Sequence, residues 1–208
     1  MITGKKIVSR TNADTDYISV ATAKEHLRVT TTADDTYISS LISAALDVCS
    51  HYVGYELRES VCKYGFTELV GQPATVNPLN GAPLLMGNYL RIPAKVISLD
   101  LLQYSDQDNT LQTFTDYITE PLQLSNFGLD VYLNSLPTSL TDAETKYIAT
   151  VTEGFTPTDF SASLKIACLF LVAQYYDNRQ NIIVGASVME MPKGTEFLLD
   201  KYKLSTFA

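Results

Sequence analysis

Two long segments with helical periodicity lie towards opposite ends of the chain, and they constrain its fold more than any other feature. Residues 21–53 and 160–179 repeat apolar side chains every three or four positions, which is the spacing of a helix with a buried face. About a hundred residues of strand-like sequence separate them. We therefore predict an α+β fold, in which N-terminal and C-terminal helices form a small helical bundle that carries an inserted antiparallel β-domain.

The predicted domain organisation follows the points where this pattern changes. Ser19 is suited to cap the first helix, and Gly54 to end the long one, because serine accepts hydrogen bonds from helix N–H groups and glycine adopts left-handed backbone. The four predicted parts are an N-terminal arm (1–18), the first part of the helical body (19–54), the inserted β-domain (55–154) and the second part of the body with a C-terminal docking helix (155–208).

Within the predicted insertion, short β-rich stretches alternate with turn sequences. The run SDQDNT, which begins after residue 104, is rich in Asp and Asn and is typical of a hairpin turn. We expect about five to seven strands. The candidates are residues 60–70, 89–92, 96–104, 114–119, 129–133 and 146–151.

Composition argues against several functional classes. The net charge of −8 is opposite to that of a domain that grips nucleic acid, although an acidic wall would let a duplex slide past. The simpler interpretation is that this charge keeps the protein soluble. Three cysteines far apart in sequence predict no disulfide framework and a reducing site of synthesis. The N-terminus lacks the apolar run of a signal peptide, and the longest apolar stretch, 166–173, is too short to span a bilayer.

The sequence contains no group of residues with the spacing of an active site. His26 and His51 are the only histidines, and His51 points away from Cys49 on the same helix, so the two cannot share a metal ion. The pair Tyr175-Tyr176 has helical spacing from apolar neighbours, which favours a place in the core over a binding platform. We therefore predict no catalytic residue, no cofactor and a protein that is not an enzyme.

Two D-x-D pairs have the spacing of part of a cation-binding loop. Asp14 with Asp16, and Asp106 with Asp108, lack the further carboxylates that a calcium or magnesium loop requires. We interpret both pairs as solvated turns and predict no metal site.

The order of these segments resembles the head–tail connector family of tailed bacteriophages, whose members are also called adaptor or head-completion proteins. Family members show a similar A-K-x-H-L-R motif, then acidic residues, then a long amphipathic helix. The matching segments here are AKEHLRV at 23–29, Asp34-Asp35, the helical run at 38–46, the strand end at 151–155, YDNR at 176–179 and the terminal helix at 192–204.

This resemblance implies a structural virion protein that forms an adaptor ring between the portal vertex and the tail. Family members form such a ring, commonly a dodecamer, extend the DNA channel and present a surface to the next component. The implied partners are further copies of the chain, the portal protein and a stopper or tail protein, with DNA only as a passing duplex and no membrane. The implied location is the virion neck, at the head–tail interface, after synthesis in the cytoplasm of the host bacterium.

Two sets of residues are predicted to meet partners. The helix at 160–177 is apolar on nearly all sides, and residues 181–191 carry no charge before Glu190, so both require cover that a neighbouring subunit would supply. The candidates for this interface are Ile166, Phe170, Ile182, Ile183 and Val184. By resemblance, the terminal helix is the portal-docking element, unless it packs only on its own subunit. Its candidate residues are Lys193, Phe197, Leu198, Lys201 and Tyr202.

Two other functions remain open at the level of sequence. One is another head-completion or tail-completion protein, such as a stopper or tail terminator, which would be mainly β. The other is a small metal-dependent hydrolase or nuclease, whose activity would depend on Asp106 and Asp108.

Overall fold

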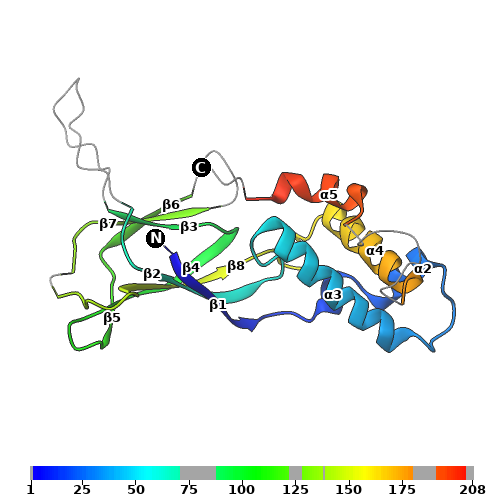
Figure 1. The fold of residues 1–208 in the computed structure, drawn as a ribbon, viewed down its shortest axis with the longest axis horizontal. Helices are drawn as coiled ribbons and strands as arrows, with labels where there is room; N and C mark the ends of the chain where they lie inside the picture. The colour runs from blue at the N-terminus through cyan, green and yellow to red at the C-terminus, as the bar shows by residue number, and fades with distance from the viewer. Residues whose placement is uncertain (1, 71–87, 122–127, 138, 180–190, 205–208) are drawn as a thin grey trace, which may run out of the picture. The chain divides into compact units, whose positions relative to one another are not determined.

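The computed structural model describes residues 2–70, 88–121, 128–137, 139–179 and 191–204. The chain forms two compact units, each assembled from stretches that are far apart in sequence (Figure 1). The β unit contains residues 1–9 and 60–153, and the helical unit contains residues 10–59 and 154–208. The presence of helices together with antiparallel sheets confirms the predicted α+β class.

The helical unit contains the two long helices that the sequence predicts. Ser19 caps the second helix as expected, because its hydroxyl accepts the N–H of Thr22 at 3.1 Å. The long N-terminal helix ends at Gly54, whose φ of 91° is left-handed. The elements are α1 (Asp14–Tyr17), α2 (Val20–Leu27), α3 (Asp35–Val53), α4 (Ala162–Asp177), α5 (Lys193–Leu199) and the 3-10 turn η1 (Asp200–Tyr202).

The core of the helical unit lies between α3 and α4, which pack against each other in Figure 1. The Sγ atoms of Cys49 and Cys168 are 3.5 Å apart at this contact, and both thiols are free and buried. Other buried side chains come from the predicted stripe of each helix, and they are Ile38, Leu41, Ile42, Ala45, Leu46 and Val53 on α3 and Leu164, Ala167, Leu171 and Val172 on α4. Each large one contributes about 1.5–3 kcal/mol by leaving water.

The β unit contains a five-stranded and a three-stranded sheet. The first has the order β1 (Ile2–Arg10), β2 (Ser60–Phe66), β8 (Tyr147–Glu153), β4 (Val96–Ser105) and β5 (Leu111–Thr113). The second has the order β3 (Tyr89–Ile92), β7 (Leu129–Leu133) and β6 (Tyr117–Pro121). Within each sheet the pairs whose register is defined are antiparallel.

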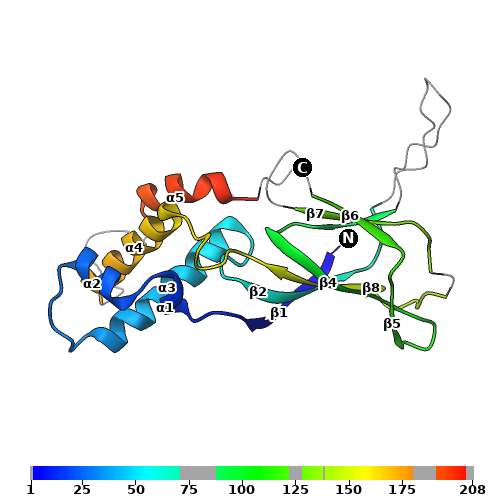
Figure 2. The ribbon, with the colours of Figure 1, turned by 180° about the vertical axis from the view of Figure 1, so that it is seen from behind.

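Alternating burial shows which side of each sheet faces the core. In β2, Cys62, Tyr64 and Phe66 are buried, whereas Lys63 between them is exposed. The three-stranded sheet buries Leu90, Ile92, Val131 and Leu133. This sheet lies over the five-stranded sheet in both Figure 1 and Figure 2, so the core of the unit lies between the two buried faces.

Several strands coincide with their predicted bounds, and the N-terminal region differs most. Residues 89–92 and 129–133 form β3 and β7 as predicted, whereas the candidate at 114–119 is replaced by β5 and β6 on either side of residue 114. Residues 1–18, expected to be a loose arm, contain β1 and α1. β1 is an edge strand that Lys5 ties down by donating to buried Glu153 at 2.5 Å, and Tyr64 donates to the same carboxylate at 2.5 Å.

Candidate functional site

α5 runs back along α4, so the C-terminal residues lie on the surface of the last long helix. Three contacts define the antiparallel register. A Cβ atom at Gly194 would lie 3.6 Å from the ring of Phe170, in the middle of α4. At the start of α4, Lys201 Nζ donates to Ser163 Oγ at 3.1 Å, and the hydroxyls of Tyr202 and Ser161 are 2.5 Å apart. Phe197 therefore lies beside the stretch of α4 that contains Ile166 and Phe170.

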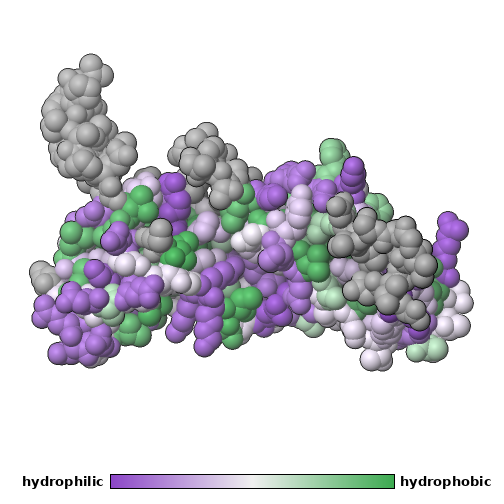
Figure 3. Space-filling model, in the orientation of Figure 1, coloured by the Kyte–Doolittle hydropathy of each residue, from purple (hydrophilic) through white to green (hydrophobic). Residues whose placement is uncertain are grey.

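Three large apolar side chains are exposed on this pair of helices. Phe197 is 80% exposed, Ile166 44% and Phe170 38%. We call them the α4–α5 patch. Figure 3 shows hydrophobic atoms projecting from the surface over α5. Exposed aromatic groups next to aliphatic ones are typical of protein–protein contact surfaces.

The predicted portal-docking residues differ in how far they are exposed to solvent. Phe197, Lys193 and Lys201 are exposed, whereas Leu198 and Tyr202 are half-buried. The ring of Tyr202 packs on that of Phe155 at 5.9 Å, besides its bond to Ser161. Of the predicted interface residues, Ile166 and Phe170 are exposed on α4, the helix along which α5 packs. Ile182, Ile183 and Val184 lie outside the described residues.

Segments that carry the family resemblance meet at the N-terminus of α3. Lys24 donates to Asp35 at 2.7 Å, and Tyr176 donates to Asp34 at 2.7 Å. Arg179 also pairs with Asp34, at 3.3 Å, and lies over the ring of Tyr37 at 4.7 Å. The hydrogen bond from Tyr176, and then the charge of Arg179, lower the pKa of Asp34. The motifs at 23–29, 34–35 and 176–179 therefore join α2, α3 and α4 at one place.

This geometry decides between the two interpretations of the tyrosine pair on α4. Tyr175 and Tyr176 are half-buried rather than part of the core. The backbone oxygen of Tyr175 accepts the hydroxyl of Tyr37 at 3.4 Å, and the rings of Tyr37 and Tyr176 are 6.1 Å apart. Both residues therefore hold α4 to α3 at the edge of the core.

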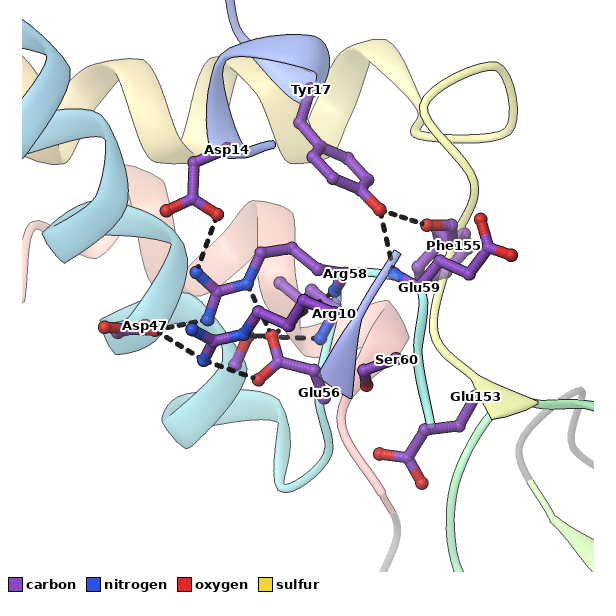
Figure 4. Close-up of polar contacts among 12 residues, drawn as sticks. Arg10, Asp14, Tyr17, Asp47, Glu56, Arg58, Glu59, Ser60, Glu153 and Phe155 are labelled. Atoms are coloured by element: carbon purple, nitrogen blue, oxygen red, sulfur yellow. Dashed lines mark hydrogen bonds and ion pairs between the residues drawn. The ribbon is translucent and has the colours of Figure 1, made fainter. Parts of the chain in front are cut away.

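A cluster of ionic side chains, which sequence reasoning missed, lies inside the helical unit (Figure 4). Arg58 is only 1% exposed, and its Nε donates to Glu56 Oε1 at 2.7 Å. Its Nη1 donates to Asp14 Oδ1 at 3.0 Å, and its Nη2 contacts Asp47. Arg10 reaches Asp47 and Glu56 from the solvent side at 3.3 and 3.2 Å. One guanidinium thus ties α1, α3 and the segment after α3 together, which we call the Arg58 cluster.

The cluster keeps its carboxylates ionised. Burial acts to raise the pKa of Asp14, but hydrogen bonds from Ser43 and Arg58 outweigh it and the pKa is lowered. Burial likewise acts to raise the pKa of Glu56, and the hydrogen bond and charge of Arg58 again lower it. Arg58 is itself a stronger base than usual, since its three carboxylate partners outweigh the burial that acts to lower its pKa.

These shifts predict that acid destabilises the helical unit. A carboxyl whose pKa is lower in the folded than in the unfolded state stabilises the fold above its ordinary pKa, and this contribution is lost as the pH falls through the lowered value. We expect the free energy of unfolding to decline below pH 4.5, the ordinary value for Glu56, and further below 3.8, that for Asp14. Urea titrations at a series of pH values, followed by helical circular dichroism, measure this. Glu56→Gln should flatten the dependence, and an unchanged slope would contradict this assignment.

The aspartates and the histidine that the sequence offered as possible metal ligands have contacts typical of structural residues. The carboxylate of Asp106 accepts the N–H groups of Asp108 and Thr110 at 3.0 and 2.9 Å, as expected of a turn. His26 lies against the ring of Phe170 at 6.1 Å between ring centres. Within the described residues, no three His, Cys, Asp or Glu side chains lie close enough to hold a metal ion, and no helix is long and apolar enough to cross a membrane.

Comparisons with known proteins agree with these features. Residues 17–79 match the model of a family described as phage gp6-like head-tail connector proteins. A chain from the neck of an empty gene transfer agent particle, computed with C6 symmetry, has a similar fold, with a TM-score of 0.71 and 18% identity over 99% of this chain and 97% of that chain. A chain from the neck of the native particle, computed with C12 symmetry, matches with a TM-score of 0.66 and 18% identity over 100% and 97%.

A chain of the native gene transfer agent virion matches similarly, with a TM-score of 0.67 and 19% identity over 98% of this chain and 97% of that chain. No curated protein matches the sequence. The family match over residues 17–79 includes the AKEHLRV motif, the acidic pair and α3, and the fold matches extend over nearly the whole chain. The family match lies on the segment that carries the sequence resemblance to head–tail connector proteins, and the solved structures show that the fold is shared over nearly the whole chain.

Proposed function

We propose that this protein is a structural adaptor in the neck of a phage-like particle, where it joins the head to the tail without catalysing a reaction. The observation that carries this proposal is the fold shared with a gene transfer agent neck protein over 99% of the chain. The family match over residues 17–79 supports the same assignment. The site described above consists of packing contacts and an exposed apolar patch, which are features of an assembly component.

The proposed working form is a ring of twelve copies around the DNA channel. The similar neck structures were computed with C6 and C12 symmetry, and these are the symmetries that a dodecameric ring can have. The proposed partners are the portal protein on one side and a stopper or tail protein on the other, with DNA only as a passing duplex. The net charge of −8 suits a wall along which a duplex slides.

In this proposal the helices are the body of the subunit and the β unit is an insertion. The division of the chain into units at residues 59/60 and 153/154 supports the predicted insertion of residues 55–154. Contact between the portal and Lys193, Phe197, Leu198, Lys201 and Tyr202 stays a prediction. For Tyr202, the hydrogen bond with Ser161 favours the alternative interpretation, in which the residue packs on its own subunit and does not contact the portal.

Electron microscopy of the purified protein tests the ring directly. We expect negative-stain images to show rings with a central hole, and light scattering on the same sample to give the mass of about twelve copies. If the free chain is monomeric, the same measurements are made after adding heads that contain the portal. A chain that forms no ring alone and does not bind these heads would contradict the proposed function.

A further inference from the structure

The α4–α5 patch brings together, on two neighbouring helices, residues that were predicted to meet two different partners. Ile166 and Phe170 lie one turn apart on α4, and the antiparallel register places Phe197 beside them. The following inference rests on the proposed ring and concerns which surface of the next subunit this patch contacts.

Phe197 is the most exposed large apolar side chain of those that the structure describes. It projects from α5 with Lys193 one turn before it and Lys201 one turn after it, and both lysines are exposed. Glu196, which directly precedes Phe197 in α5, is half-buried. The patch is thus an aromatic projection bordered by a Lys193–Glu196 pair three residues apart.

An open groove on α2 has the complementary form. Its apolar lining comes from Val20, Ala21 and Val29, and its charged border from Glu25 and Arg28. Lys24 also lines the groove, but its charge is compensated by Asp35 at 2.7 Å. Ala21 is the smallest of these side chains, which leaves space for a ring above it.

The groove and the patch face different directions within the helical unit. Ala23 is fully buried, and on a helix Glu25 lies ~200° around the axis from it, so the groove is on the outer side of α2. His26, by contrast, faces α4 through the ring of Phe170. A protein with a projection on one face and a matching groove on another associates head to tail, which is the arrangement that closes into a ring.

We propose that the α4–α5 patch of one subunit docks into the α2 groove of the next subunit, with Phe197 over Ala21. The charges on the two borders are complementary. Lys193 on α5 meets Glu25 on α2, and Glu196 meets Arg28, the left-handed residue that directly follows α2. Phe197 therefore belongs to the seam between subunits rather than to the portal contact.

Engineered cysteines test this contact, because the three natural cysteines are buried and free. Variants A21C and F197C are made separately, mixed, and oxidised with diamide in assembled rings, or on portal-containing heads if the free chain is monomeric. We expect the mixture to give cross-linked dimers, each variant alone to stay uncross-linked, and the double variant A21C/F197C to give a ladder of higher oligomers. Dimers of F197C alone, or no cross-link in the mixture, would overturn the proposal.

A charge exchange adds a second test that does not require a new thiol. K193E and E25K should each lower the cross-linking yield, and K193E/E25K in one chain should restore it, since the pair is regenerated with reversed signs. F197A should weaken ring association about 30-fold or more, the effect of losing a hot-spot side chain. K6E, which makes the same charge change on β1, is the matched control and should have no effect.

The outcomes separate this contact from the proposed function. One outcome would overturn the contact and leave the adaptor function standing. In it, rings form normally, residues 21 and 197 give no cross-link, and the charge substitutions K193E and E25K do not change ring assembly. A chain that assembles neither alone nor on heads would overturn both. Heads that still bind F197A monomers, without rings, would support the seam and exclude Phe197 as the portal contact.

Discussion

Substitution of Arg58 by alanine is expected to destabilise the helical unit by about 3–5 kcal/mol, the usual cost of removing one partner from a buried ion pair. Arg58 is 1% exposed, and the side chain of Glu56, to which its Nε donates, is 4% exposed. The variant leaves the Glu56 carboxylate in the interior without its main cation. Asp14 and Asp47 are more exposed, at 22% and 58%, so water replaces part of what they lose. The cost therefore arises chiefly at Glu56.

Arg10→Ala is the matched control, because Arg10 contacts two of the same carboxylates from the surface. Its side chain is 40% exposed, and exposed ion pairs contribute only about 0–1 kcal/mol. Urea unfolding of both variants, followed by helical circular dichroism, measures the difference. Equal losses in the two variants would show that burial does not set the strength of this cluster. The variant E56Q/R58M should recover part of the stability lost in R58A, because it removes the stranded charge and restores volume.

The helices could be predicted because their periodicity reflects a single physical requirement. Ile38, Leu41, Ile42 and Leu46 recur at the helical spacing, and all four are buried in the core of the helical unit. A pattern of this kind is local, so a sequence reveals it without knowledge of the partner helix. The bounds of β3 and β7 could be predicted for a similar reason, since each is short and flanked by turn or loop residues.

β1 could not be predicted, because what holds it is not local. Its sequence, ITGKKIVSR, contains Lys5-Lys6 and little that favours a buried strand, and all of its residues after Ile2 are exposed. Pairing with β2 and the bond from Lys5 to Glu153, distant in sequence, keep it in the sheet. Edge strands commonly carry lysine in this way. Propensity alone therefore predicted a loose arm.

The Arg58 cluster was missed because its pattern is misleading. In the run Tyr55-Glu56-Leu57-Arg58, apolar and charged residues alternate, and this alternation normally places charges towards solvent. Here all four side chains are buried, since α1 and α3 supply carboxylates that the local sequence does not contain. The exposed residues of the α4–α5 patch could be predicted individually. That these residues lie on neighbouring helices could be seen only from the structure, because it depends on the antiparallel packing of α5 on α4.

Substitution of Gly154 by alanine is the second change expected to have a large effect. Gly154 has a φ of +100°, and a Cβ atom there would lie 2.2 Å from the carbonyl oxygen of Arg58 and 3.0 Å from the nitrogen of Glu59. The backbone alone costs about 1–3 kcal/mol when a residue with a side chain adopts such a conformation. The clash adds to this, because the neighbouring atoms are backbone held by hydrogen bonds from Glu59 to Phe155 at 3.0 Å and from Phe155 to Leu57 at 2.9 Å.

Gly54→Ala separates the two contributions. Gly54 has a similar φ of +91°, but its added Cβ would meet only the flexible side chain of Leu204, at 3.4 Å. We therefore expect Gly54→Ala to lose about 1–3 kcal/mol of unfolding free energy, the backbone cost alone. Gly154→Ala should lose more, or give insoluble protein, because the chain cannot keep both backbone bonds and admit the methyl group. Urea unfolding of the two variants side by side measures the excess. Equal losses in the two variants would mean that the segment after β8 shifts to make room for the methyl group. Glycine would then be needed at position 154 only for its left-handed backbone conformation, and not to avoid a clash with the backbone of Arg58.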